Sequence, residues 1–144
     1  MKALLDTSLL VAALVEAHPR HEQAFPWLLR IRDSEVTAAI AAHSIAETYS
    51  VLSSLPVSPR ITPSAAWALI EHSVLPFVET VDARAREVQE TIRNLSRQGI
   101  TGGVVFDALI AAAGLKVHAD CIVTFNIEDF RRVVREGEID IREP

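Results

Sequence analysis

Four acidic side chains, far apart along the chain, have neighbours that favour metal or acid–base chemistry. They are Asp6, Glu47, Asp107 and Asp129. Asp6 directly follows the apolar run Ala3–Leu5, which does not alternate with polar residues and therefore predicts a strand buried on both faces. Helix is expected from Leu9 to Val15, so Asp6 lies where a buried strand passes into a helix. In open α/β sheets, ligands bind at that edge.

Two of these acids have an equally simple structural explanation as helix caps. Asp6 precedes Thr7 and Ser8, which favour a helix start, so its carboxylate has the option of capping the helix that follows. Asn126 and Asp129 come after the predicted strand Cys121–Phe125 and have the spacing of a local cap. The residues alone leave both explanations open. A carboxylate that is buried at the sheet edge, however, needs a cation or hydrogen-bond donors.

The other two acids lie in the first turns of predicted helices. Ser44 and Glu47 have capping-box spacing, which allows Glu47 to bond back to the helix start. Asp107 is the only charge in the first half of an apolar helix, where the helix dipole favours an acid. The apolar neighbours Val105 and Phe106 bring Asp107 into a partly buried position, where it again needs a partner.

The remaining patterns predict strands that alternate with helices. Further strands are expected at residues 35–38, 74–80 and 138–141, and further helices at residues 19–32, 44–52, 62–73, 82–98 and 104–113. In the helix 44–52, the buried stripe is expected to be Ile45, Thr48, Val51 and Leu52. Asp82 is expected to cap the helix 82–98. This alternation predicts a single α/β domain built on right-handed βαβ units.

Composition limits the class of protein without selecting one. The 144 residues are 49% hydrophobic and 23% charged, with a formal net charge of −5. That charge is unusual for a nucleic-acid-binding protein, but carboxylates around a metal ion lower it without repelling phosphate once the ion is bound. No stretch is long and apolar enough for a membrane span or a signal peptide, so the cytosol is the expected compartment. The single cysteine, Cys121, excludes an internal disulfide.

The acids are expected to converge because they follow strands or begin helices. In a parallel sheet, the carboxyl ends of strands and the amino ends of the following helices share one edge. Clustered carboxylates repel one another and need a counterion. A site with only oxygen ligands suits Mg²⁺ or Mn²⁺ and does not suit zinc. Such a site is able to activate water for phosphodiester hydrolysis.

Four segments together resemble the PIN domains, and most closely the VapC-type ribonuclease toxins of bacterial toxin–antitoxin pairs. The segments are Leu4–Ser8, Ile45–Tyr49, Asp107–Ala111 and Val123–Phe130. The resemblance covers almost the whole chain, residues 1–144. It implies a four- or five-stranded, mainly parallel sheet flanked by helices on both sides. It also implies cleavage of single-stranded RNA that depends on Mg²⁺, with Mn²⁺ as a substitute.

The resemblance also implies roles for individual residues. Asp6, Glu47 and Asp107 match the acidic triad of the family. Asp6 and Asp107 are expected to bind the ion directly, and Glu47 to hold its water or a second ion. Many PIN domains carry an acid directly after the last strand, where this chain has Asn126, and Asp129 follows three residues later. Asp129 is therefore the fourth candidate catalytic acid, and the supporting positions are expected at Thr7, Thr124 and Asn126.

The partners expected from the resemblance are RNA, a VapB-like antitoxin and a second copy of the chain in a homodimer. The antitoxin tail is expected in an apolar groove, with Phe25, Trp27 and Trp67 as candidate residues. Ordinary core packing is the alternative, and we favour it for Trp27.

Two sets of arginines are candidates for the flanks of the RNA cleft. They are Arg84, Arg86, Arg93 and Arg97 on one predicted helix and Arg131, Arg132 and Arg135 on another. His18 and His21 have a spacing that would allow a metal, but no further ligand lies near them in sequence. Two other functions stay open: a catalytically inactive PIN scaffold that binds protein or RNA, which the Asn126 departure motivates, and a different metal-dependent phosphoryl-transfer enzyme.

Overall fold

The computed structural model describes all 144 residues and contains one sheet of five parallel strands. The strand order is β3-β2-β1-β4-β5, so the first strand of the chain is the central one. The strands are β1 (Lys2–Leu5), β2 (Thr37–Ala41), β3 (Glu79–Val81), β4 (Cys121–Val123) and β5 (Asp140–Arg142). The predicted α/β class and the mainly parallel sheet are confirmed, and every neighbouring pair of strands is parallel.

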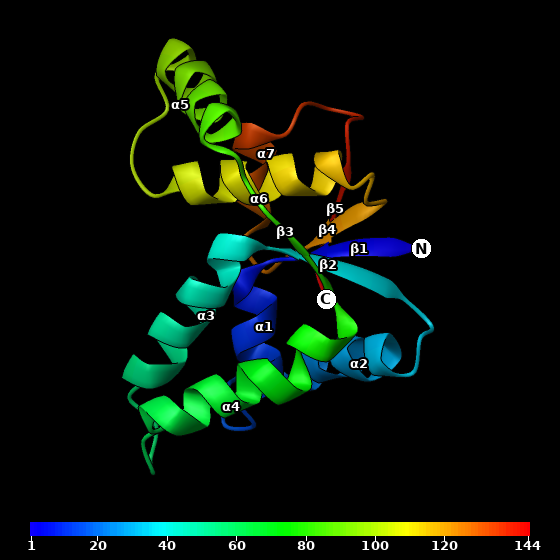
Figure 1. Ribbon diagram of the computed structural model, residues 1–144, viewed down its shortest axis with the longest axis vertical. Coiled ribbons are helices and arrows are strands. Elements are labelled where there is room, and N and C mark those ends of the chain that lie inside the picture. The colour runs from blue at the N-terminus through cyan, green and yellow to red at the C-terminus, as the bar shows by residue number, and fades with distance from the viewer.

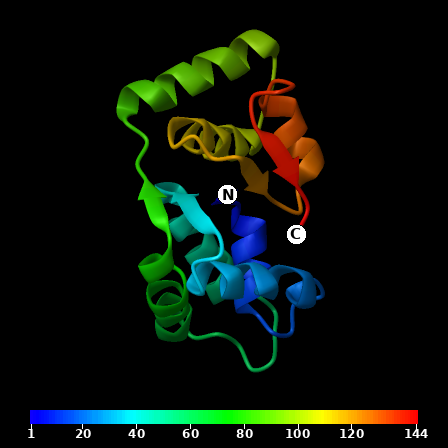
Figure 2. The same cartoon turned by 90° about the vertical axis from the view of Figure 1, so that its right-hand side faces the viewer.

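Seven α-helices cover both faces of this sheet, with α1 to α4 on one side and α5 to α7 on the other (Figures 1 and 2). They are α1 (Thr7–Leu14), α2 (His21–Arg32), α3 (Ala42–Ser54), α4 (Pro63–Ser73), α5 (Ala85–Gln98), α6 (Val104–Lys116) and α7 (Ile127–Val133). None of these helices combines the length and apolar character that a membrane crossing requires.

The central strand is buried on both faces, as its unbroken apolar sequence predicts. Ala3 and Leu5 pack into the core under α1 and α2, whereas Leu4 packs into the core under α6 and α7. All three residues are fully buried. Successive side chains of a strand point to opposite faces, so helices on both sides require an apolar residue at every position.

The register between β1 and β4 determines what lies at the sheet edge. Leu5 pairs with Val123, and the Asp6 N–H donates to the Val123 carbonyl over 3.1 Å. Asp6 and Thr124 are therefore the first residues after β1 and β4, and they follow directly on the paired residues Leu5 and Val123. The sequence positions of these residues are far apart, but the parallel ladder brings them together.

Several element boundaries differ from prediction because pairing overrides local propensity. β2 begins at Thr37 and continues to Ala41, since its alanines pair with β1 and β3 although alanine is a weak strand former. The expected strand 74–80 is instead a 3₁₀ turn (η1, Leu75–Phe77) around Pro76, followed by the short edge strand β3. α5 begins after Arg84, whose N–H donates to Glu87 Oε2 over 2.7 Å, so the predicted Asp82 cap is wrong.

The buried face of α3 also differs from the predicted stripe. α3 begins two residues before Ser44, and Ser44, Thr48 and Leu52 are its buried residues. Val51, predicted to be buried, is 37% exposed. The earlier start moves Ser44 from the cap into the helix interior, and Ser44, Thr48 and Leu52 then form a stripe with a four-residue repeat.

The aromatic residues proposed for a partner groove separate into two groups. Phe25 on α2 and Trp67 on α4 are 40% and 42% exposed, respectively. Trp27 packs against the core, as favoured above, and the Arg30 guanidinium lies 5.0 Å from the centre of its ring.

One close contact holds α6 against the sheet. A Cβ atom added to Gly114 would lie 3.1 Å from side-chain atoms of both Leu4 and Ile139. The face of α6 that contacts the sheet also carries Ile110 and Ala111, which are buried in the same core. Gly114 therefore allows the helix to approach the central strand closely.

We expect Gly114→Val to lower the free energy of unfolding by about 1–3 kcal/mol, because its methyl groups have no space beside Leu4 and Ile139. Ala112→Val is the matched control: it places the same side chain on the same helix, where Ala112 lines two cavities. In the control, the free energy of unfolding should fall by only about 0.5 kcal/mol, because valine has a lower helix propensity than alanine. Urea unfolding measures both, and equal losses would contradict the close approach of α6.

Candidate active site

Three of the four predicted acids line one cavity at the carboxyl edge of the sheet. The cavity has a volume of about 470 Å³, which is within the usual range for a ligand site. Asp6 comes from the end of β1, Glu47 from α3 and Asp107 from the first turn of α6. The remaining lining includes His18, Arg20, Phe125 and Asn126, so the cavity combines acidic, basic and amide side chains.

Asp6 is the most rigidly held of these acids. It is only 2% exposed and is the N-cap of α1, where its Oδ2 accepts from the Ser8 N–H over 3.3 Å. Oδ2 also accepts from the hydroxyls of Ser8 and Thr124, the latter over 2.8 Å. All three hydrogen bonds go to Oδ2, which leaves Oδ1 without a protein donor. The capping explanation for Asp6 is therefore correct, and the same carboxylate still presents one free oxygen at the cavity.

The two hydroxyls beside Asp6 link separate parts of the chain. The Ser8 Oγ accepts from the Phe125 N–H over 3.1 Å, and the Thr124 Oγ1 accepts from the Asn126 N–H over 2.9 Å. Each hydroxyl has one proton, and each donates that proton to Asp6 Oδ2. Their mutual contact of 3.4 Å is thus an approach between two acceptors and adds little. The network fixes the β1–α1 junction against the β4–α7 junction.

Asp107 lies on the face of α6 that contacts the sheet, one turn beyond the sheet edge. Ile110, Ala111 and Gly114 continue that face at the following i+3, i+4 and i+7 positions. The position explains why an acid in an apolar helix is half-buried. Burial, together with the negative charges of Asp6, Asp129 and Glu47, raises the pKa of the Asp107 carboxyl to about 7, with His43 acting in the opposite direction.

Glu47 does not form the predicted capping box. α3 begins at Ala42, no side chain caps it, and Glu47 lies in its second turn. Glu47 Oε1 is buried and lies 3.1 Å from the His43 Nε2, but the groups are poorly aligned, and neither atom has a hydrogen-bond partner. Oε1 therefore faces His43, and no hydrogen bond or ion pair of the protein engages the other carboxylate oxygen, Oε2.

Asn126 and Asp129 take different places. Asn126 occupies the N-cap position of α7 without a side-chain capping bond and lines the cavity. Asp129 does not line the cavity and has Arg132 Nη1 at 4.0 Å from its Oδ1. Its charge still raises the Asp107 pKa, so Asp129 lies close behind the site. The local cap proposed for these two residues is not formed.

The side chains at this edge fit a hard divalent cation. Asp6 Oδ1 and Glu47 Oε2 lack donors, and burial together with repulsion from the other acids holds the Asp107 pKa high, which a bound cation would counteract. No three His, Cys, Asp or Glu side chains lie close enough to form a complete ligand set. Mg²⁺ does not require such a set, because it retains several waters and commonly binds through one or two carboxylates.

The basic residues at the cavity are not those that the sequence pattern predicted. None of the seven arginines in the two predicted sets lines it, whereas Arg20 and His18 do. Both belong to the connection between α1 and α2. Only the position of these residues in the chain could have indicated this: α1 directly follows Asp6 and is only eight residues long, so the connection after it is close to the site in sequence. The His21 Nδ1 contacts the Ala12 carbonyl over 3.0 Å, and no third His, Cys, Asp or Glu joins His18 and His21 in a metal-binding group.

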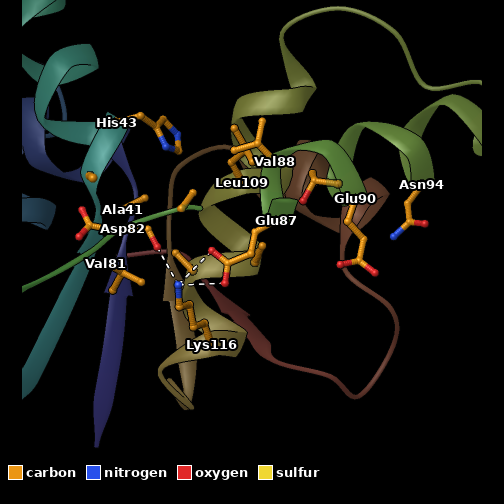
Figure 3. A pocket seen from close by; sticks show the side chains of 15 residues that line it. Ala41, His43, Val81, Asp82, Glu87, Val88, Glu90, Asn94, Leu109 and Lys116 are labelled. Carbon is orange, nitrogen blue, oxygen red and sulfur yellow. Dashed lines mark hydrogen bonds and ion pairs between the residues drawn. The ribbon is translucent and has the colours of Figure 1, made fainter. Parts of the chain in front are cut away.

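A second cavity of about 440 Å³ lies between α5 and α6 (Figure 3). Its Glu87 carboxylate is already paired with the Lys116 ammonium at 2.9 Å, and Lys116 also donates to the Asp82 carbonyl. It contains none of the four predicted acids.

We expect the Asp107 titration to change the stability of the metal-free protein. Between about pH 4 and pH 7 the unfolded chain has lost this proton while the folded chain retains it, so the free energy of unfolding falls as pH rises. In EDTA, Asp107→Asn should be more stable than the parent by about 1–2 kcal/mol at pH 8, a value discounted for partial exposure. The difference should shrink toward zero near pH 4.

Urea unfolding across this pH range measures the effect. Glu90→Gln is the control, because Glu90 is exposed and has no ion pair, and a surface substitution of this kind should change stability by less than about 0.5 kcal/mol. A constant difference for Asp107→Asn would show that its carboxyl is not crowded by the other acids.

Comparison with known proteins identifies the family. The model of the protein family described as PIN domain matches residues 3–136 of this chain. Ribonuclease VapC27 of Mycobacterium tuberculosis (strain ATCC 25618 / H37Rv) is 35% identical over 117 residues, which cover 81% of this chain and 79% of that protein.

Two solved structures share the fold. The structure of Mycobacterium tuberculosis VapC20, described as a sarcin–ricin loop cleaving toxin, has a TM-score of 0.69 and 19% identity and covers 93% of this chain and 97% of its own. The structure of VapBC2 from Rickettsia felis, bound to a DNA fragment from its promoter, has a TM-score of 0.67 and 21% identity. The match covers 99% of this chain and 98% of the matched chain. With the profile extending over nearly its entire length, this chain belongs to the PIN domain family, and its curated relatives are VapC ribonucleases.

Proposed function

We propose that this chain, as one PIN domain over residues 1–144, is an endoribonuclease toxin that hydrolyses phosphodiester bonds of single-stranded RNA with Mg²⁺ or Mn²⁺. The crowding of Asp6, Glu47 and Asp107 at one cavity carries the proposal, because carboxylates that share a site repel one another and favour a cation beside them. The relatives support the substrate class: VapC27 is named a ribonuclease, and VapC20 is described as cleaving the sarcin–ricin loop.

In this proposal Asp6 and Asp107 hold the ion. Asp6 offers its free Oδ1, and Asp107 ionises fully when a positive charge is beside it. When bound, a divalent ion polarises the scissile phosphate and lowers the pKa of water. Glu47 orients the attacking water through its carboxylate oxygen Oε2, which no group of the protein engages. Asp129, set back from the cavity, adds negative charge that favours cation binding.

Three neutral residues support these acids. Thr124 orients Asp6 through its donated hydrogen bond, and Asn126 presents a neutral amide to the cavity. Thr7 also lines the cavity, and its buried hydroxyl has no hydrogen-bond partner in the protein. None of the three adds negative charge, and Thr124 holds Asp6 in place directly.

The proposed partners are a cognate antitoxin and a second copy of the chain. Solved relatives include the complex VapBC2 of Rickettsia felis. The exposed Phe25 and Trp67 on α2 and α4 supply apolar surface for an antitoxin segment. Co-purification with the neighbouring gene product tests this assignment.

Asp6→Asn and Asp107→Asn should each lower the rate of RNA cleavage by more than about 100-fold. Loss of a residue that only supports a metal ligand lowers activity by about 10–100-fold, and loss of the ligand itself should lower it further. EDTA should have the same effect on the parent, and added Mn²⁺ should reverse it. The readout is cleavage of cellular RNA with mapped 5′ ends, and Glu90→Gln is the control with an amide at an exposed site.

Persistent cleavage by both folded Asp variants would reject these assignments. RNA binding by the parent without any cleavage in Mn²⁺ would instead favour the inactive scaffold.

Thr124→Val should weaken the apparent affinity for Mn²⁺ by about 10–100-fold, because the hydrogen bond that orients Asp6 is lost while the side-chain shape is retained. Thr124→Ser keeps the hydroxyl and should recover most of the affinity. Activity measured as a function of Mn²⁺ concentration gives both values. Equal losses in the two variants would show that packing at this fully buried position, and not the hydroxyl, supports the site.

A further inference from the structure

Arg20 lines the acidic cavity without being neutralised by it. The cavity contains Asp6, Glu47 and Asp107, but none of these acids forms an ion pair with Arg20. The Arg20 guanidinium instead lies 4.7 Å from the centre of the Phe125 ring. Its only ion pair is with Glu143, over 2.9 Å. A cation and a cluster of acids thus share one cavity while remaining separate.

The Phe125 ring and the Glu143 carboxylate hold the guanidinium in position. Phe125 packs against the core beneath α1 and α2, so the platform under Arg20 is fixed. The ion pair is weaker support, because both of its side chains are about half-exposed and screened by solvent. A ligand anion is therefore able to replace Glu143 on a guanidinium that is already oriented.

His18 supplies a neutral donor beside this cation. Its Nδ1 accepts from the Arg20 backbone N–H over 3.1 Å, which places the ring proton on Nε2. Burial lowers the His18 pKa, and the positive charges of Arg20 and His21 lower it further, in agreement with the neutral tautomer. The ring therefore offers one N–H at the cavity, and its orientation is set by the same backbone that positions Arg20.

A cation and an N–H donor near an acidic cluster suit a phosphodiester chain. In such a complex, one RNA phosphate would lie at the acids and their ion. The next phosphate along the RNA needs a positively charged group nearby, because the protein as a whole has a net charge of −5 and would otherwise repel it. Arginine binds phosphate oxygens with two parallel hydrogen bonds. None of the arginines on α5 or α7 lines this cavity, so they do not meet this need.

We propose that Arg20 and His18 form a binding subsite for an RNA backbone phosphate next to the scissile one, with Phe125 supporting the Arg20 guanidinium. This subsite rests on the proposed ribonuclease function. Glu143 competes with the phosphate for Arg20 in the free protein.

The test compares variants of the full chain with a labelled single-stranded RNA of about 12 nucleotides. Arg20→Gln should raise KM by about tenfold, because it removes a charge-assisted phosphate contact, and should change kcat by less than about twofold. Arg20→Lys should recover part of the loss. Glu143→Gln should lower KM by about two- to fivefold, because it frees Arg20 from an exposed ion pair.

Arg30→Gln is the matched control. Arg30 has the same two kinds of contact, with the Trp27 ring at 5.0 Å and Glu35 at 3.7 Å, but it does not line the cavity. It loses the same charge, so a general loss of attraction for RNA would appear in this variant as well.

RNA binding in EDTA is measured separately against salt concentration. Loss of one phosphate contact should reduce the slope of log affinity against log salt by about 0.7 in Arg20→Gln, and Arg30→Gln should retain the parent slope. An unchanged slope and KM in Arg20→Gln would overturn the subsite, as would a loss confined to kcat. If the parent binds RNA but cleaves none, the proposed function fails while the slope still tests the subsite.

Discussion

The structure depends on how it compensates a buried carboxylate at the end of its central strand. Asp6 is nearly inaccessible to solvent, and an unpartnered charge in that position would be costly. Three donors share the compensation, and they come from the first turn of α1 and from the end of β4. Asp107 has no such donors, and burial together with the neighbouring negative charges raises its pKa. One acid is thus fixed by the fold, and another is left dependent on what enters the cavity.

The topology of the sheet makes this compensation possible. β1 is central, and the connections on its two sides place their helices on opposite faces of the sheet. Ligand crevices form at such a reversal, outside the carboxyl ends of the strands. The pairing of Leu5 with Val123 then brings Thr124 beside Asp6. The same reversal places the first turn of α6, and with it Asp107, above the strand ends.

Features with a strong local cause could be predicted from the sequence, and those that depend on tertiary geometry could not. The apolar runs in the sequence correctly predicted that β1 and β4 are buried. The acids at strand ends and helix starts correctly predicted where the cavity lies. The start of α3 was misjudged, because Ser44 is a good cap in isolation while the alanines before it continue as strand and helix. Arg20 was missed because no periodic pattern marks a short connection that passes beside the site.

The segment from Thr124 to Asn126 shows how one strand end serves several purposes. Thr124 orients Asp6, Phe125 lies under the Arg20 guanidinium, and Asn126 lines the cavity. Asparagine at this position contributes an amide oxygen without adding another negative charge to a site that already raises the Asp107 pKa. An acid at position 126 would hold a second cation more firmly, but it would also increase repulsion toward an anionic ligand whenever that cation is absent. The neutral amide, with Asp129 set back toward Arg132, keeps the negative charge at the cavity lower than a fourth lining acid would.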